Sequence, residues 1–266
     1  MTETTQGDAA RPEDLVPERR SSLGNILTIA RREISGYFAS PVAYVFIVIF
    51  LLLAGFFTFM VADFFGRGQA TLASFFAWHP WLYLFLVPAV GMRMWAEERR
   101  LGTIELLLTM PVTPWQAIMG KFLASWAVLI LALALTFPLV IAVNYLGRPD
   151  NGIIVAGYLG SALLAGAYLS IAAMTSAMTR NQVVSFILAV VLCLFLILAG
   201  FTPVTDLLVH WANPWFVQVV SNFSVITHFQ AIQRGVLDSR DILFFLSVIV
   251  FCLFTTSVIL RTHRAG

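Results

Sequence analysis

Long runs of apolar residues, separated by short charged segments, follow one another along the chain. A helix needs about 20 residues to cross a hydrocarbon core about 30 Å thick. The second run contains Pro80 and Pro88, so we expect its helix to begin near Pro80 and to bend near Pro88. Together the runs predict six transmembrane helices, at residues 41–62, 68–92, 122–147, 151–179, 181–205 and 242–260.

The composition supports a membrane protein. Of the 266 residues, 59% are hydrophobic and 11% are charged, whereas about a quarter of the residues of an average soluble domain are charged. The net charge of +2, without a basic run that carries aromatic residues, gives no indication of nucleic-acid binding. Cys193 and Cys252 lie inside apolar runs, so we expect neither a disulfide nor a metal site from them. The predicted fold class is an all-α integral membrane protein.

The N-terminal region is predicted to have two parts. Residues 1–22 are polar and lack the short apolar region of a signal peptide, so we expect a disordered cytoplasmic tail. In residues 23–40, apolar side chains recur at helical spacing while Arg31, Arg32 and Glu33 take the other face. This pattern predicts an amphipathic helix along the cytoplasmic membrane surface, in preference to a helix packed on a soluble domain.

The basic residues predict the orientation of the chain. If six helices cross and the N-terminus is inside, twelve Lys and Arg residues, Lys121 among them, face the cytoplasm and four face outside. Basic residues favour the cytoplasmic side of a membrane, so both termini are predicted to be cytoplasmic. The transmembrane domain then covers residues 41–260, and residues 261–266 form a short inner tail.

Residues 206–241 are predicted to form an outer segment that does not cross the membrane. Its charge-free part, 207–233, is too polar for a span that faces lipid. We expect two short re-entrant helices, broken at Asn213 and Pro214, which dip into the outer leaflet or cap the bundle. Hydrogen bonds and ion pairs are expected to hold this segment through side chains that lie close in sequence: His228, Arg234, Asp238, Arg240 and Asp241.

The segment 93–121 is the one sizeable charged island between the apolar runs. Six charges fall within its first thirteen residues, and each costs about 2.5 to 3.5 kcal/mol at the bilayer centre, so we place the segment in the cytoplasm. Gly102 separates the charged turn from a half-apolar turn that Thr103 can cap, and Pro111 and Pro114 end it. We expect a short helix lying across the membrane face.

Two motifs carry a family resemblance. From Met92 the chain reads Met-Arg-x-x-Ala-Glu-Glu-Arg-Arg-x-Gly-Thr-Ile-Glu-Leu-Leu-Leu-Thr-x-Pro-Val, and Gly120-Lys121-Phe122 follows. The second motif runs from His228-Phe229 through Arg234-Gly235-Val236 to Arg240-Asp241. They resemble the permease subunits of ABC-2 type transporters, especially the gliding-motility-associated branch, and the copper-enzyme-maturation permeases are similar as well. The resemblance covers roughly residues 24–260.

The resemblance implies a half-transporter of the bacterial inner membrane. Such subunits pair, usually as homodimers, and each binds a cytoplasmic ATPase. This chain has no Gly-x-x-x-x-Gly-Lys-Ser/Thr phosphate loop, so ATP and magnesium are expected on the partner ATPase and no cofactor on this chain. The segment between the second and third spans would be the coupling helix that docks on the ATPase, with these candidate residues: Glu97, Glu98, Arg99, Arg100, Gly102, Thr103 and Glu105.

Catalysis and metal binding are not expected. Glu97 and Glu98 are adjacent, so their side chains point about 100° apart on a helix, which does not suit an acid–base pair. His79, His210 and His228 lie near tryptophans, as is typical of a membrane interface. We therefore interpret the three histidines as interfacial or structural residues.

Three functions remain to be compared. The first is an export-type ABC permease that couples ATP hydrolysis to translocation. The second is a mechanotransmitting or scaffold subunit that passes ATPase motion to an outer partner protein and moves no cargo. The third, an ion-driven carrier, requires an ionisable group near the midplane. The predicted spans hold no charged residue, which counts against the third.

Overall fold

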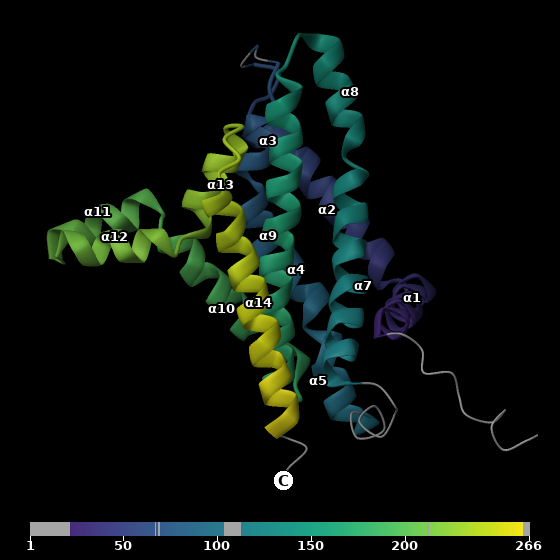
Figure 1. Cartoon of the computed structure of the whole chain (residues 1–266). Coiled ribbons are helices and arrows are strands. Elements are labelled where there is room, and N and C mark those ends of the chain that lie inside the picture. The colour runs from purple at the N-terminus through teal and green to yellow at the C-terminus, as the bar shows by residue number, and fades with distance from the viewer. Residues whose placement is uncertain (1–21, 67, 69, 104–112, 212, 263–266) are drawn as a thin grey trace, which may run out of the picture.

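The computed structural model describes residues 22–66, 68, 70–103, 113–211 and 213–262. The described residues form helices joined by turns, with no β-strand among them (Figure 1). In chain order the elements are α1 (Ser22–Ala39), α2 (Val42–Phe56), the π-helix η2 (Phe57–Val61), α3 (Ala73–Ala77), α4 (His79–Gly91), α5 (Arg93–Leu101), α7 (Pro114–Ala134), α8 (Phe137–Leu146), α9 (Asn151–Met178), α10 (Gln182–Leu198), α11 (Thr202–Trp211), α12 (Pro214–Asn222), α13 (Val225–Gln233) and α14 (Ser239–Thr262).

The helix α9 is the centre of the bundle. It packs on α4, α7, α10, α13 and α14, and it is the most deeply buried of the long apolar helices. Its small residues allow close approach, as small residues do between membrane helices. A Cβ atom at Gly157 would lie 2.5 Å from the ring of Phe76, and one at Gly160 would lie 2.8 Å from Ile232 of α13.

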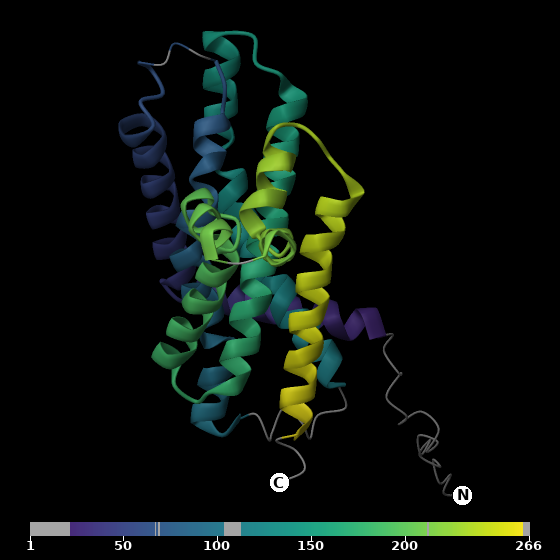
Figure 2. The ribbon, with the colours of Figure 1, turned by 90° about the vertical axis from the view of Figure 1, so that its left-hand side faces the viewer.

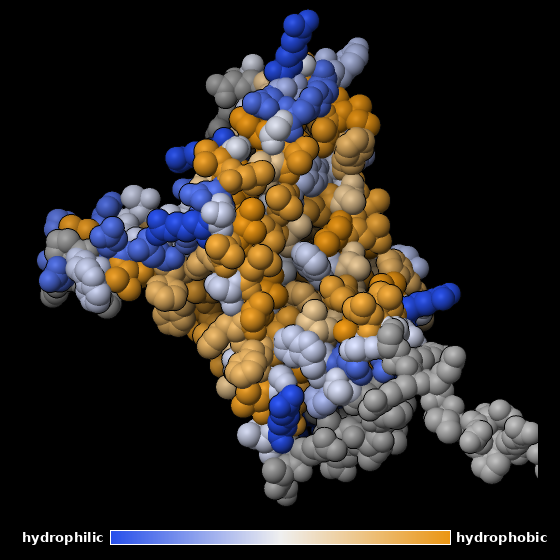
Figure 3. All heavy atoms as spheres, in the orientation of Figure 1, coloured by the Kyte–Doolittle hydropathy of each residue, from blue (hydrophilic) through white to orange (hydrophobic). Residues whose placement is uncertain are grey.

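Four of the described helical segments are long and apolar enough to cross a membrane. They are α2 with η2, α7 with α8, α9, and α14. Of the other two predicted spans, α10 has 17 residues and α4 has 13, so six crossings and the orientation stay predictions. Apolar side chains cover the sides of the bundle seen in Figure 3, and hydrophilic ones gather toward its ends and on the side hairpin.

Prolines and polar side chains set several helix boundaries. As expected, α4 begins at His79 with Pro80 in its first turn and Pro88 in its interior. The third predicted span begins earlier than expected, because Thr113 and Gln116 form a reciprocal capping box that starts α7 at Pro114 rather than near Phe122.

The outer helices do not all lie where they were expected. The break between α11 and α12 falls at Asn213 and Pro214, as the sequence predicted. These two helices form a hairpin that projects sideways from the bundle and packs mainly on itself (Figures 1 and 2). The hairpin does not lie over the bundle, and α13 packs against α9, α10 and α14 instead. The other expectation, that the hairpin dips into the outer leaflet, stays a prediction.

The helix α1 packs along α7. Its contact is close because Gly120 of α7 has no side chain, and a Cβ atom there would lie 2.6 Å from Ile29. Leu23 and Leu27, which belong to the predicted apolar stripe, are 71% and 65% exposed. One part of the apolar stripe therefore packs on α7, and the other part is exposed on the outside of the bundle. The location of α1 on a membrane surface stays a prediction.

Candidate functional site

The charged turn of the predicted coupling segment forms α5 at one end of the bundle. Met94, Trp95 and Ala96 are buried, whereas Arg100 is exposed. The helix ends at Gly102, whose φ of 72° lies in the left-handed region and whose N–H bonds to the carbonyl of Glu98. This is the break that the sequence predicted.

Two predicted features lie at and beyond Thr103. The hydroxyl of Thr103 donates to the carbonyl of Glu98 at 3.4 Å, so its side chain bonds back to α5. The N–H groups that it would cap lie outside the described residues, so the cap at Thr103 stays a prediction. Glu105 and the half-apolar residues 104–112 lie outside the described residues.

Gly102 gives a first prediction. A β-carbon in the left-handed region costs roughly 1 to 2 kcal/mol, so Gly102→Val should lower the free energy of unfolding by about that amount. Gly102→Asn is the matched control, since asparagine tolerates this conformation. Heat unfolding of both variants in nanodiscs measures the difference, and equal unfolding of the valine and asparagine variants would show that the turn is not formed.

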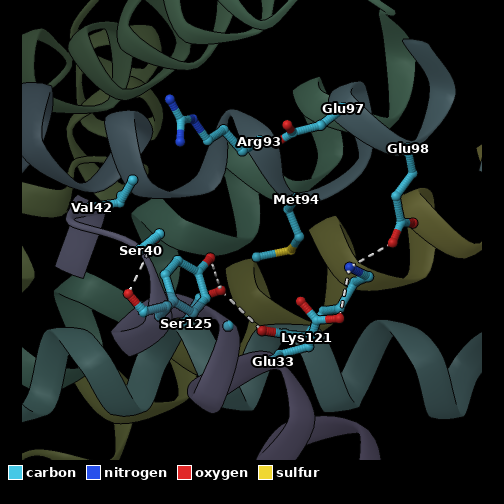
Figure 4. A pocket seen from close by; sticks show the side chains of 11 residues that line it. Glu33, Ser40, Val42, Arg93, Met94, Glu97, Glu98, Lys121 and Ser125 are labelled. Atoms are coloured by element: carbon cyan, nitrogen blue, oxygen red, sulfur yellow. Dashed lines mark hydrogen bonds and ion pairs between the residues drawn. The ribbon is translucent and has the colours of Figure 1, made fainter. Parts of the chain in front are cut away.

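Lys121 is the electrostatic centre of the site. Its side chain is 7% exposed, and its Nζ atom lies 2.9 Å from Oε1 of Glu98 and 3.2 Å from Oε1 of Glu33 (Figure 4). The ammonium also lies 5.5 Å from the ring centroid of Trp95. The three side chains come from α7, α5 and α1, so this ion triad joins three helices at one point.

The triad bears on three sequence-based expectations. Lys121 was counted among the basic residues that face the cytoplasm, and it is buried. Glu33 was placed on the polar face of α1, and the predicted spans held no charge because the third was expected to begin at residue 122, after Lys121. A buried ammonium needs carboxylates close by, which explains why Glu33 turns toward α7. Lys121 lies near the start of the span Pro114–Leu146 and is paired within the chain, so it does not supply a free group near a midplane.

Ser176 of α9 fixes the start of α5. Its Oγ atom accepts hydrogen bonds from the N–H groups of Trp95 and Ala96, both at 3.0 Å, and donates to the carbonyl of Met92 at 2.8 Å. The first N–H groups of a helix have no partner within that helix, so the hydroxyl serves as a cap supplied from another helix. Nothing in the sequence indicated this role for Ser176.

Arg99 makes a second contact with α9. Its guanidinium donates to the carbonyl of Ala177, in the last turn of that helix. Partial burial, and then the nearby Arg180, lower the pKa of Arg99 from its ordinary value. Arginine is not deprotonated in proteins, so the side chain remains a cation beside the negative end of the helix dipole.

A cavity of about 280 Å³ lies between α1, α5, α7 and the start of α2. Arg93 and Glu97 line it together with the ion triad (Figure 4). Within the described part of the chain, Glu97 forms no ion pair. The predicted coupling residues are therefore divided: Glu98 and Arg99 bind other helices, Glu97 faces the cavity, and Arg100, Gly102 and Thr103 are exposed.

The predicted outer residues form a second cluster. His228 and Asp241 are buried, with Nδ1 and Oδ1 2.6 Å apart, and His228 Nε2 lies 3.0 Å from the carbonyl oxygen of Asn222. Arg240 donates to Oδ1 of Asn222 at 3.1 Å, and its backbone N–H donates to Oδ1 of Asp238.

Two outer residues differ from the expectation. Arg234 is exposed and joins no ion pair among the described residues, so it is not part of the cluster. Asn222, which the sequence did not single out, lies at its centre.

His79 lies inside the bundle. It is fully buried, its Nδ1 lies 3.1 Å from the carbonyl oxygen of Phe75, and the rings of Phe50, Phe76 and Tyr83 surround it. This burial fits a structural role, and its location at a membrane interface stays a prediction. Across the described residues, no group of three or more His, Cys, Asp or Glu side chains is placed to hold a metal ion.

Comparison with known proteins agrees with this architecture. Residues 68–260 match the ABC-2 family transporter protein family. The inner membrane transport permease YhhJ of Escherichia coli K12 is 30% identical over 143 residues, and the protein of the same name from Shigella flexneri is equally similar. The aligned region is 53% of this chain and 36% of each relative. The match to most of the bundle shows that this chain is a member of the ABC-2 transporter family.

Proposed function

We propose that the chain is the membrane-spanning permease subunit of an export-type ABC transporter in the bacterial inner membrane, and that α5 passes the motion of a separate ATPase to the bundle. Membership of the ABC-2 family and the similarity to inner membrane transport permeases support the class. One observation carries the coupling role: α5 is tied to three other helices, through Ser176, Arg99 and Lys121.

These ties would make α5 move as a unit with its neighbours. A push on α5 acts on α9 through Ser176 and Arg99, on α7 through Lys121, and on α1 through the Lys121–Glu33 pair. Packed helices shift as rigid elements, since a close-packed interior does not deform continuously. The ion triad is therefore proposed to keep the three helices together during the transport cycle.

The helix α9 offers a route across the bundle. Its 28 residues form one continuous helix about 42 Å long, at 1.5 Å per residue. Gly160, in its other half, packs directly on Ile232 of α13. A displacement that begins at Ser176 would thus reach the outer cluster around His228 without a flexible joint.

The docking surface is assigned to the exposed end of α5. Arg100, Gly102 and Thr103 are exposed there, and Leu101 is 63% exposed. A charged side chain beside an apolar one suits an interface with a soluble protein. The ATPase would carry ATP and magnesium, and a second copy of the chain would complete the transport pathway, with both termini of each copy in the cytoplasm.

Arg100 provides the test of docking. Arg100→Glu reverses an exposed charge that makes no contact with the ion triad, so the heat unfolding of the chain should stay unchanged. The amount of ATPase that co-purifies with the chain from native membranes should fall at least about tenfold, since like charges that face each other at an interface cost several kcal/mol. Arg148→Glu, at the opposite end of the bundle, is the control. Full retention of the ATPase by the Arg100 variant would contradict the proposal.

A mechanotransmitting or scaffold subunit is the second candidate. The continuous route from α5 through α9 to α13 favours it as much as it favours transport, because the outer cluster and the hairpin lie at the end of that route. An outer accessory protein would then receive the motion. Reconstitution of the chain with its ATPase in vesicles distinguishes the two functions. Transport of a co-purifying cargo would support the transporter. Recovery of a bound outer protein, with no cargo transported, would support the scaffold.

A further inference from the structure

His228 in α13 lies between two oxygen atoms that belong to different helices. Its Nδ1 is 2.6 Å from Oδ1 of Asp241 at the start of α14, and its Nε2 is 3.0 Å from the carbonyl oxygen of Asn222 at the end of α12. Phe244 stacks on the imidazole at 4.1 Å. Both His228 and Asp241 are buried, so water does not replace these contacts readily.

The two contacts fix the number of protons on the pair. A carbonyl oxygen only accepts hydrogen bonds, so Nε2 of His228 must carry a proton. A second proton must lie between Nδ1 and the carboxylate of Asp241, because two lone pairs would otherwise face each other at 2.6 Å. The pair is thus either imidazolium with carboxylate or imidazole with carboxylic acid, and it carries no net charge in both forms.

Asn222 connects this pair to the side hairpin. It is the last residue of α12, and α12 and α11 pack mainly on each other (Figure 2). The carbonyl at a helix C-terminus lacks a partner within that helix, and a cation there is favourable. Two side chains therefore hold the base of the hairpin: His228 through the carbonyl oxygen of Asn222, and Arg240 through its side-chain oxygen.

We propose that His228 is a proton-dependent latch that holds the α11–α12 hairpin against the bundle. A neutral imidazole has one N–H group and can serve only one of its two partners while Asp241 is ionised. The hydrogen bond to a carboxylate is the stronger one. The neutral ring therefore keeps its hydrogen bond to Asp241 and loses the one to the carbonyl of Asn222. The latched state binds one more proton than the released state, and it is therefore favoured at low pH and lost as the pH rises.

The charged groups around the ring allow this response. Of the acidic and basic residues at the start of α14, Asp241 contacts the ring, whereas Asp238 and Arg240 contact each other and Asn222. The helices α3, α9, α10 and α12 contain no Asp, Glu, Lys, Arg or His. Among the acidic and basic side chains of the described helices packed around His228, Asp241 is consequently the one that contacts the ring.

The distance between the hairpin and the central helix tests the latch. Spin labels at Gln218→Cys in α12 and Val155→Cys in α9, both exposed positions, would be introduced with Cys193 and Cys252 replaced by alanine. Distances are then measured by pulsed electron paramagnetic resonance on the full chain in nanodiscs, between about pH 5 and pH 8, where histidine changes charge. We expect one narrow distribution at low pH and a longer, broader population that grows as the pH rises.

Asp241→Asn is the decisive variant. Its amide N–H can donate to Nδ1 of a neutral His228 while Nε2–H still donates to Asn222, so the short distance should persist at every pH. Asp238→Asn, which changes a neighbouring carboxylate that does not contact the ring, should keep the wild-type response. Distances that do not change with pH in the wild-type chain, or an unchanged pH response in Asp241→Asn, would overturn the latch. The readout is a distance and needs no ATPase, so its result is independent of the proposed transport function.

Discussion

Lys121→Met is expected to lower the free energy of unfolding by about 3 kcal/mol. Removal of one partner of a buried ion pair costs about 3 to 5 kcal/mol, since the remaining charge is left uncompensated. The side chains of Glu33 and Glu98 are 26% and 24% exposed, so water relieves part of this cost and the lower end applies. Heat and denaturant unfolding in nanodiscs would measure the loss.

A triple variant separates the loss of pairing from the loss of packing. In Lys121→Met with Glu33→Gln and Glu98→Gln no charge is left unpaired, and a buried ion group replaced by neutral side chains of similar size is often no less stable. The triple variant should therefore recover most of the stability that Lys121→Met loses. If it is as unstable as the single variant, packing of the lysine chain rather than its charge holds the junction.

The triad also predicts a functional separation. In the triple variant α5 keeps its contacts with α9 but loses its charged link to α7 and α1. If the triad couples these helices, the chain should still bind its ATPase while ATP hydrolysis no longer drives transport. Full transport by a stable triple variant would show that the link to α1 and α7 serves stability alone.

Ser176→Ala is expected to destabilise the chain by about 1 to 3 kcal/mol and to weaken the link between α5 and α9, which then depends on Arg99. The substitution leaves the N–H groups of Trp95 and Ala96 and the carbonyl of Met92 without the hydroxyl that joins them. A buried polar group without a partner costs about 1 to 3 kcal/mol, and the three groups share this cost because they relax together.

Ser161→Ala is the matched control for Ser176→Ala. Ser161 lies in the same helix and is equally buried, but its hydroxyl donates only to the carbonyl of Gly157 within α9. That carbonyl keeps its hydrogen bond to a backbone N–H of the helix, so the free energy of unfolding should fall by less than about 1 kcal/mol. Similar unfolding of the two variants would mean that Ser176 does not fix the start of α5.

The outer cluster could be anticipated because its members are close in sequence. A single turn between α13 and α14 separates His228 from Asp241, so the two side chains can hardly lie far apart. The sequence therefore predicted hydrogen bonds and ion pairs among these residues. In the structure His228 pairs with Asp241, whereas Arg234 joins no ion pair among the described residues. Asn222 was missed since it acts chiefly through its backbone carbonyl, which side-chain identity does not reveal.

The charged end of the bundle was only partly predictable. The sequence by itself determined the apolar helices, the charged turn with its end at Gly102, the break at Asn213 and the family resemblance, because these follow from local periodicity, backbone preferences and short motifs. It did not determine that Lys121 lies between Glu33 and Glu98, or that Ser176 caps α5. Periodicity tells which face of a helix is apolar, but it does not tell which other helix lies against that face. The packing of α1 on α7 and of α9 on α5 decided those contacts. It also decided that Arg100 and Leu101, rather than Glu98 and Arg99, are assigned to the proposed docking surface.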